Sequence, residues 1–151
     1  MTSGTPYAGG LFVANYFVSE QPFALIVSPR DTGDLDPRPW GKATANVATD
    51  FLDGFANTDA MVAAGSKLAK DIRALRIGDH DDWYLPSRLE SLLLFGSLAG
   101  DLQKTWYWTS TQYAGDDEYA WIQLFTNGNQ YGYHREASRS RARAVRRVPI
   151  R

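Results

Sequence analysis

The sequence has 151 residues and contains no cysteine. This absence excludes disulfides, thiolate metal sites and cysteine nucleophiles. Basic and acidic residues nearly cancel, and the net charge of −1 predicts no bulk attraction to nucleic acid. No apolar run approaches the length of a membrane span, and the N-terminal residues lack the basic start and apolar core of a secretory signal. We therefore expect no nucleic-acid partner, no membrane insertion, no signal peptide, and synthesis in a host cytoplasm.

Patterns for catalysis and metal binding are also scarce. The only histidines are His80 and His134, and neither belongs to a recognisable serine–histidine–aspartate set. We expect His134 to be a hydrogen-bonded, partly buried imidazole. Calcium needs six or more oxygens that converge on one point, whereas acidic loops are more often simply solvated. We therefore predict a chain that is not an enzyme and has no cofactor and no metal site. The acidic groups lie at residues 31–36, 79–82 and 116–118.

Aromatic residues, in contrast, are frequent, with 5 tryptophans and 8 tyrosines. Many of them fall in one stretch, residues 106–134, which reads as three short strands with little charge outside one acidic loop. Asn127-Gly128 lies between two runs of strand-forming residues. It predicts a two-residue hairpin turn, since both central residues of a type I′ turn need positive φ.

This hairpin register sorts the side chains into two faces, because opposed residues of an antiparallel pair share a face. Leu124 lies opposite Tyr131 in this register, and Trp121 opposite His134. Both faces carry large apolar groups, so one covers the core and the other meets another element, a partner or a ligand. One face holds Trp121, Gln123, Phe125, Gln130, Gly132 and His134, and the other holds Ile122, Leu124, Tyr131 and Tyr133.

The rest of the chain predicts strands at both ends and helices between them, which describes an α+β domain. Strands are expected at residues 11–18 and 23–28, and a last strand at 141–150 is expected to pair with the first. Residues 1–10 form an N-terminal arm, and residues 11–151 form a single domain that is long enough for a core.

Helix signals occupy the middle of the chain. After a loop at residues 29–41, an apolar stripe at 47–52 predicts a helix that Gly54 closes.

Further helices are marked by capping residues. Asn57 or Thr58 can cap a short helix, and Ser66 can cap the next one. Ser87 and Glu90 have the spacing of a capping box, in which each side chain satisfies a backbone N–H at the start of a helix.

Several segments, taken in order, are similar to one family. Residues 81–87 (DDWYLPS), 107–111 (YWTST), 119–128 (YAW followed by FTNG) and 141–146 (RARAVR) resemble the Lcl C-terminal-like domain family. Residues 53–58 (DGFANT) resemble a motif of its phage-type members. The resemblance implies a C-type-lectin-like fold, found in bacterial surface and phage proteins. That fold is shared with retroelement variable proteins and with formylglycine-generating enzymes, whose activity needs the cysteine that is absent here.

The resemblance also decides which hairpin face points inward. The family's tryptophan and phenylalanine are framework positions, which implies that Trp121, Gln123 and Phe125 face the core. The opposite face then forms an outward patch, and such patches usually mark interfaces. The candidate ligand-binding or partner-binding residues are Tyr113, Tyr119, Ile122, Leu124, Asn129, Tyr131 and Tyr133.

Two functions fit this patch. The first is a non-catalytic binding module of a phage particle or bacterial surface, which recognises a protein or glycan receptor. The alternative is a structural virion subunit, such as a capsid decoration or tail-associated protein, which uses the same face for assembly and can form a homo-oligomer. Both place the mature protein on a virion or cell surface.

The two ends of the chain complete the prediction. The arm has no period of its own, so its order needs an outside contact. We expect Pro6 and Tyr7 to contact a neighbouring subunit, with a simple extension of the first strand as the intramolecular alternative. The arginine-rich segment 135–151 is expected to be an edge strand that pairs with acidic loops. Asp81 and Asp82 are expected to pair with arginines or to cap backbone N–H groups.

Overall fold

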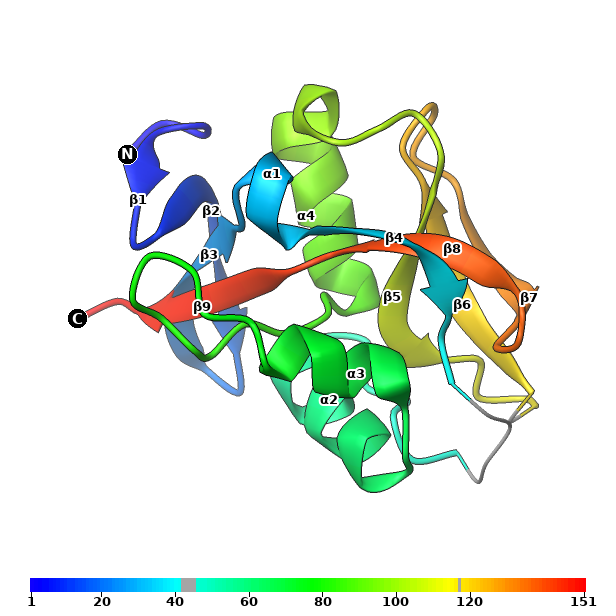
Figure 1. Cartoon of the computed structure of the whole chain (residues 1–151). Helices are drawn as coiled ribbons and strands as arrows, with labels where there is room; N and C mark the ends of the chain where they lie inside the picture. The colour runs from blue at the N-terminus through cyan, green and yellow to red at the C-terminus, as the bar shows by residue number, and fades with distance from the viewer. Residues whose placement is uncertain (42–45, 117) are drawn as a thin grey trace.

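The computed structural model describes residues 1–41, 46–116 and 118–151. Within these residues the chain is a mixed α+β fold with two sheets and four α-helices, as the sequence predicts at the level of fold class. Figure 1 shows α4 running between the two sheets, with α2 and α3 side by side at one end. Both termini lie at the side of the first sheet.

The first sheet has the strand order β1-β2-β3-β9 and is antiparallel throughout. The prediction that the last strand pairs with the first is therefore wrong: β9 pairs with β3, which separates it from β2. β3 is nearly all apolar, and a strand that is buried on both faces takes a central position. The strands are β1 (Pro6–Tyr7), β2 (Gly10–Val18), β3 (Gln21–Val27) and β9 (Val145–Pro149).

The second sheet has the order β4-β8-β5-β6-β7. Strands β5, β6 and β7 form the antiparallel meander that the aromatic stretch predicts. Strand β8 pairs with β5 in parallel. β7 is left as an edge strand. The strands are β4 (Asp34–Pro39), β8 (Arg139–Arg143), β5 (Trp106–Gln112), β6 (Tyr119–Leu124) and β7 (Gln130–Arg135).

The helices begin largely where capping residues predict. Ser66 caps α3, and Ser87 with Glu90 forms the expected capping box at the start of α4. Asp53, however, caps α2, by accepting a hydrogen bond from the backbone N–H of Ala56, so Asn57 and Thr58 lie inside this helix. The helices are α1 (Arg30–Gly33), α2 (Gly54–Ala63), α3 (Lys67–Arg73), α4 (Arg88–Leu98) and the 3-10 turn η1 (Ala99–Asp101).

Two local predictions in the first half are wrong. Residues 47–52 are not helical, and Gly54 begins a helix instead of ending one. An added Cβ at Gly54 would lie 2.3 Å from a carboxylate oxygen of Glu90, so this glycine allows a close approach to α4. The expected loop 29–41 contains α1 and β4, because β4 finds a partner in β8, far along the chain. Residues 42–45, which precede the predicted helix, lie outside the described residues.

The β6–β7 hairpin is wider than predicted. Gly128 has a φ of +83°, but Asn127 is not among the residues with positive φ, so the type I′ turn does not form. The backbone N–H of Leu124 donates to the carbonyl of Asn129 at 2.8 Å, which leaves four residues in the loop. Phe125 leaves the ladder and packs into the core, and the pairing moves by two residues, so that Ile122 lies opposite Tyr131.

A one-residue irregularity follows in the same pair of strands. Ala120 lies opposite His134, and the register shifts between this pair and Ile122 opposite Tyr131. The predicted opposition of Trp121 and His134 is therefore wrong, since the extra residue lies in β7. His134 is half-buried, as expected, and its ring packs against Trp108 with centroids 4.9 Å apart.

The outward orientation predicted for Ile122 is also wrong. Its side chain is only 2% exposed and belongs to the core cluster that contains Trp108 and Trp40. The opposite face of the strand is buried too, because Gln123 and Phe125 lie under α4. Both faces at the centre of β6 are thus covered. The exposed side chains of this hairpin lie on the edge strand β7 and in the loops.

Glu90, which is fully buried, joins elements of both halves of the chain. Its Oε2 accepts hydrogen bonds from the hydroxyls of Tyr16 in β2 and Tyr84 before α4. Its Oε1 accepts the backbone N–H groups of Ser87 at 2.9 Å and Gly54 at 3.1 Å. Burial raises the pKa of Glu90, because the charged form loses its hydration.

Most arginines of the C-terminal segment pair with carboxylates, as predicted, but the segment is not one edge strand, because β8 lies between β4 and β5 in the second sheet. Asp82 accepts two hydrogen bonds from Arg146, at 2.7 and 3.1 Å. These contacts tie β9 and β8 to loops far away in the sequence, and β9 forms an edge of its sheet. The other pairs are Arg141 with Asp34 and Asp36, Arg143 with Asp34 and Asp101, Arg147 with Asp53, and Arg135 with Glu118.

The N-terminal arm folds back on its own domain. Pro6 and Tyr7 form β1 on the edge of β2, and the backbone N–H of Gly4 donates to the carbonyl of Phe12 at 2.8 Å. Arg146 also donates to the carbonyl of Ala8 at 2.9 Å. Of the two contacts considered for the arm, the structure has the intramolecular one. A role of Pro6 and Tyr7 in assembly stays a prediction.

We predict that the Glu90 carboxyl makes stability depend on pH. Its raised pKa means that the folded state binds the proton more tightly than the unfolded chain does. The stabilisation is complete below the unfolded pKa and is lost as the pH rises through the folded pKa. Urea unfolding between about pH 4 and pH 8 should show wild-type stability falling relative to Glu90→Gln. Glu20→Gln, at an exposed turn, is the control. A pH-independent difference between wild type and Glu90→Gln would contradict the prediction.

Removal of residues 2–8 should destabilise the domain, because β2 then loses its edge partner and Arg146 loses the acceptor at Ala8. We expect a loss of about 2 kcal/mol in the free energy of unfolding, from a few net backbone hydrogen bonds. Denaturant unfolding measures it, with deletion of Met1 alone as the control. Light scattering of the two truncated proteins tests the separate prediction that the arm contacts a neighbouring subunit. An unchanged unfolding midpoint would show that the arm contacts contribute nothing.

Candidate functional site

Three of the predicted tyrosines gather at one end of the second sheet. The hydroxyls of Tyr113 and Tyr133 lie 2.7 Å apart, and their ring centroids are separated by 4.6 Å. Tyr119 packs edge-on against Tyr133 at 5.7 Å. The hydrogen bond to Tyr133 raises the pKa of Tyr113. Tyr133 is 72% exposed, so the cluster presents a large ring to solvent from the edge strand.

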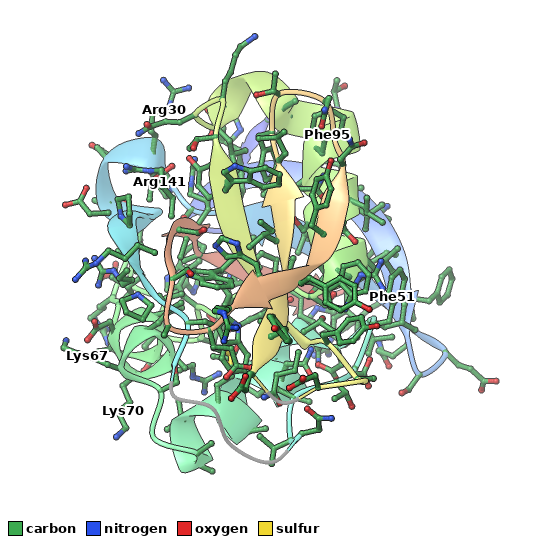
Figure 2. The ribbon with its side chains drawn as sticks, turned by 90° about the vertical axis from the view of Figure 1, so that its right-hand side faces the viewer. Arg30, Phe51, Lys67, Lys70, Phe95 and Arg141 are labelled. Atoms are coloured by element: carbon green, nitrogen blue, oxygen red, sulfur yellow. The ribbon has the colours of Figure 1, made fainter. Side chains whose placement is uncertain are left out.

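A hollow of about 270 Å³ adjoins this cluster. Trp121 and Tyr113 contribute to its wall, and their ring centroids lie 5.9 Å apart. Phe51, from the segment between β4 and α2, is exposed and lies at the right-hand side of the sheet in Figure 2, below Phe95. The described residues that line the hollow are Thr49, Phe51, Arg88, Thr111, Gln112, Tyr113, Ala114, Gly115 and Trp121.

Arg88 is the charged residue of this lining. Its guanidinium carbon lies 3.4 Å from the ring centre of Trp121 and 5.0 Å from that of Phe51. Its Nε donates to Oε1 of Gln130 at 2.9 Å, and the Gln130 amide donates back to the Arg88 carbonyl at 3.0 Å. Burial lowers the pKa of Arg88, because the guanidinium is partly removed from water.

The remaining predicted residues form a second, separate group near the hairpin. Tyr131 is 48% exposed and packs edge-on against Trp106 with centroids 5.2 Å apart. The Asn129 amide donates to the Tyr131 hydroxyl at 3.3 Å, and half-buried Leu124 lies opposite Trp106 in the ladder.

The structure thus divides the predicted site in two and removes Ile122 from it. Tyr133 packs with Tyr113 and Tyr119, whereas Tyr131 packs with Trp106 near the hairpin, and the register shift of the β6–β7 pair lies between these two groups. Sequence reasoning missed Arg88, Phe51 and Trp106. The capping box places Arg88 at the first position of a helix, but nothing local indicates that this side chain meets Trp121, which is more than thirty residues away.

Among the described residues, no group of three or more histidine, aspartate or glutamate side chains is placed to hold a metal ion. Asp117, part of one predicted acidic group, lies outside them. No helix within the described ranges is both long and apolar enough to cross a membrane.

Two further hollows lie elsewhere. The larger, of about 490 Å³, lies between β4 and α3 and includes Arg38, Lys67, Asp71 and Arg139. There the two cations Arg38 and Lys67 both bind Asp71, at 3.1 and 3.0 Å. The third, of about 280 Å³, includes Arg147, which is paired with Asp53.

Comparisons with known proteins give little further information. No family model matches the sequence, and no curated protein matches it, so the resemblance to the Lcl C-terminal-like domain stays a prediction. Among solved structures, a fimbrial protein from Bacteroides ovatus ATCC 8483 matches with 14% identity and a TM-score of 0.49. The match covers 81% of this chain and 35% of that protein's chain. A likeness at this level assigns neither a fold family nor a function.

Proposed function

We propose that this chain is a non-catalytic binding module that recognises a glycan or protein receptor with the surface formed by Tyr113, Tyr119, Tyr133 and the adjoining hollow. The observation that carries the proposal is that the exposed ring of Tyr133, packed against the half-buried rings of Tyr113 and Tyr119, lies next to a hollow of about 270 Å³. Rigid tyrosine rings offer contact area at a low cost in conformational entropy.

The support for binding, as opposed to packing, comes from the position of these rings. The central residues of β6 are covered on both faces, whereas Tyr133 lies on the edge strand with most of its surface in water. A ring that is not needed in the core, and that is held in place by two other tyrosines, is a typical binding residue.

The proposed setting is the surface of a phage particle or a bacterium, and it rests on the resemblance of the motifs and their order. A C-type-lectin-like fold is part of the same proposal. The same surface would serve a structural virion subunit as an assembly contact, and this alternative is an outcome of the test below.

Replacement of Tyr133 by alanine should weaken receptor binding by at least about tenfold, as loss of a central aromatic anchor does. Binding of the purified chain to a glycan array and to host cells measures the effect. Tyr131→Ala tests the second aromatic group, and Phe17→Ala removes an exposed ring that is 64% accessible on the other sheet, as the matched control.

Equal binding by wild type and Tyr133→Ala would remove this surface from the site. A wild-type chain that binds no receptor but self-associates, and becomes monomeric on Tyr133→Ala, would favour the assembly alternative.

A further inference from the structure

Arg88 differs from the other partly buried arginines of the chain in having no acidic partner among the described residues. Arg141, Arg143, Arg146 and Arg147 each pair with an aspartate. A guanidinium that leaves water without a compensating charge is unfavourable. Stacking between Trp121 and Phe51 offsets part of that cost but satisfies none of its N–H groups.

The orientation of the Arg88 guanidinium is fixed. Nε is used by Gln130, whose amide is held in turn by the Arg88 carbonyl and by Oε1 of Gln123 at 2.8 Å. The ring of Trp121 lies against one face of the guanidinium plane. Within the described part of the chain, no acceptor bonds the two terminal nitrogens, which therefore remain as a fork at the wall of the hollow.

We propose that Arg88 is the specificity-determining residue of the hollow and that its ligand is an acidic sugar, whose carboxylate accepts two hydrogen bonds from the terminal nitrogens of Arg88. This inference rests on the proposed function and names the ligand class of the same site. The planar fork of arginine matches the geometry of a carboxylate, and such bidentate pairs are the stronger hydrogen bonds.

The dimensions and walls of the hollow favour a sugar unit over a peptide. A volume of about 270 Å³ lies below the usual range of ligand pockets, so it suits one ring and not an extended chain. Its wall combines the rings of Trp121, Tyr113 and Phe51 with one cation and no acidic residue among the described lining residues. A ring with an apolar face and one acidic substituent is complementary to such a wall.

Titration with D-glucuronate, followed by NMR at the Trp121 indole N–H, tests the proposal. The matched ligand is D-glucuronamide, which has the same shape but no charge. We expect a saturable shift with the acid and at least about tenfold weaker binding of the amide. D-glucose 6-sulfate separates a carboxylate site from a general anion site and should bind more weakly than the acid.

Three variants separate the effect of the planar guanidinium of Arg88 from that of its charge. Arg88→Lys keeps the charge but loses the planar fork, and we expect about tenfold weaker binding of D-glucuronate. Arg139→Lys, an equivalent change at an exposed arginine of the larger hollow, should leave binding unchanged. Circular dichroism and unfolding curves confirm that each variant is folded, and Arg88→Gln provides a second, uncharged test of the same position.

Several results would overturn the inference: equal binding of acid and amide, tighter binding of the sulfate, no shift at Trp121 with any of these sugars, or full affinity in Arg88→Lys. Its failure is distinct from failure of the proposed function. Receptor binding that still depends on Tyr133 while D-glucuronate does not bind would refute only the acidic-sugar assignment.

Discussion

The fold depends on one buried carboxyl group, that of Glu90. Glu90 lies on α4, between the two sheets, and receives hydrogen bonds from β2, from the start of α2 and from the segment that precedes α4. If an apolar side chain replaced Glu90, the backbone N–H groups of Gly54 and Ser87 would be left without a partner, whereas the hydroxyls of Tyr16 and Tyr84 would keep only their bond to each other at 3.2 Å. A buried donor without a partner is costly. This one side chain therefore links the first sheet, α2 and α4.

Local signals in the sequence were sufficient where the structure is itself local. Ser66 and Ser87 mark helix starts because a cap and the N–H that it satisfies are only three residues apart. The three strands of the aromatic stretch follow from composition and alternation. The stripe at residues 47–52, by contrast, has helical spacing but no helix, since the Gln112 side chain accepts the backbone N–H groups of Val47 and Ala48 instead.

Long-range packing explains what the sequence could not predict. The hairpin register differs from the predicted one because the Phe125 ring packs between Phe95 and Tyr107, with centroid distances of 5.9 and 5.1 Å. This packing outweighs the turn preference of Asn127-Gly128. The exposure of Tyr131 and Tyr133 was predictable from alternation, but the burial of Ile122 depends on Trp108 and on residues far away in the chain. Arg88 entered the site only through its contact with Trp121, a pairing that no local pattern encodes.

Arg88 directly follows Ser87, and this adjacency links the hollow to the core. Ser87 caps α4 and donates its N–H to Glu90, while the N–H of Arg88 bonds Thr111 Oγ1 in β5 at 3.2 Å. The backbone on both sides of the arginine is thus already held before any ligand arrives. Ordering a flexible side chain is one of the costs of association, and here that cost is met during folding. Binding at this hollow should therefore proceed with little movement of the backbone, as a rigid surface meeting its ligand.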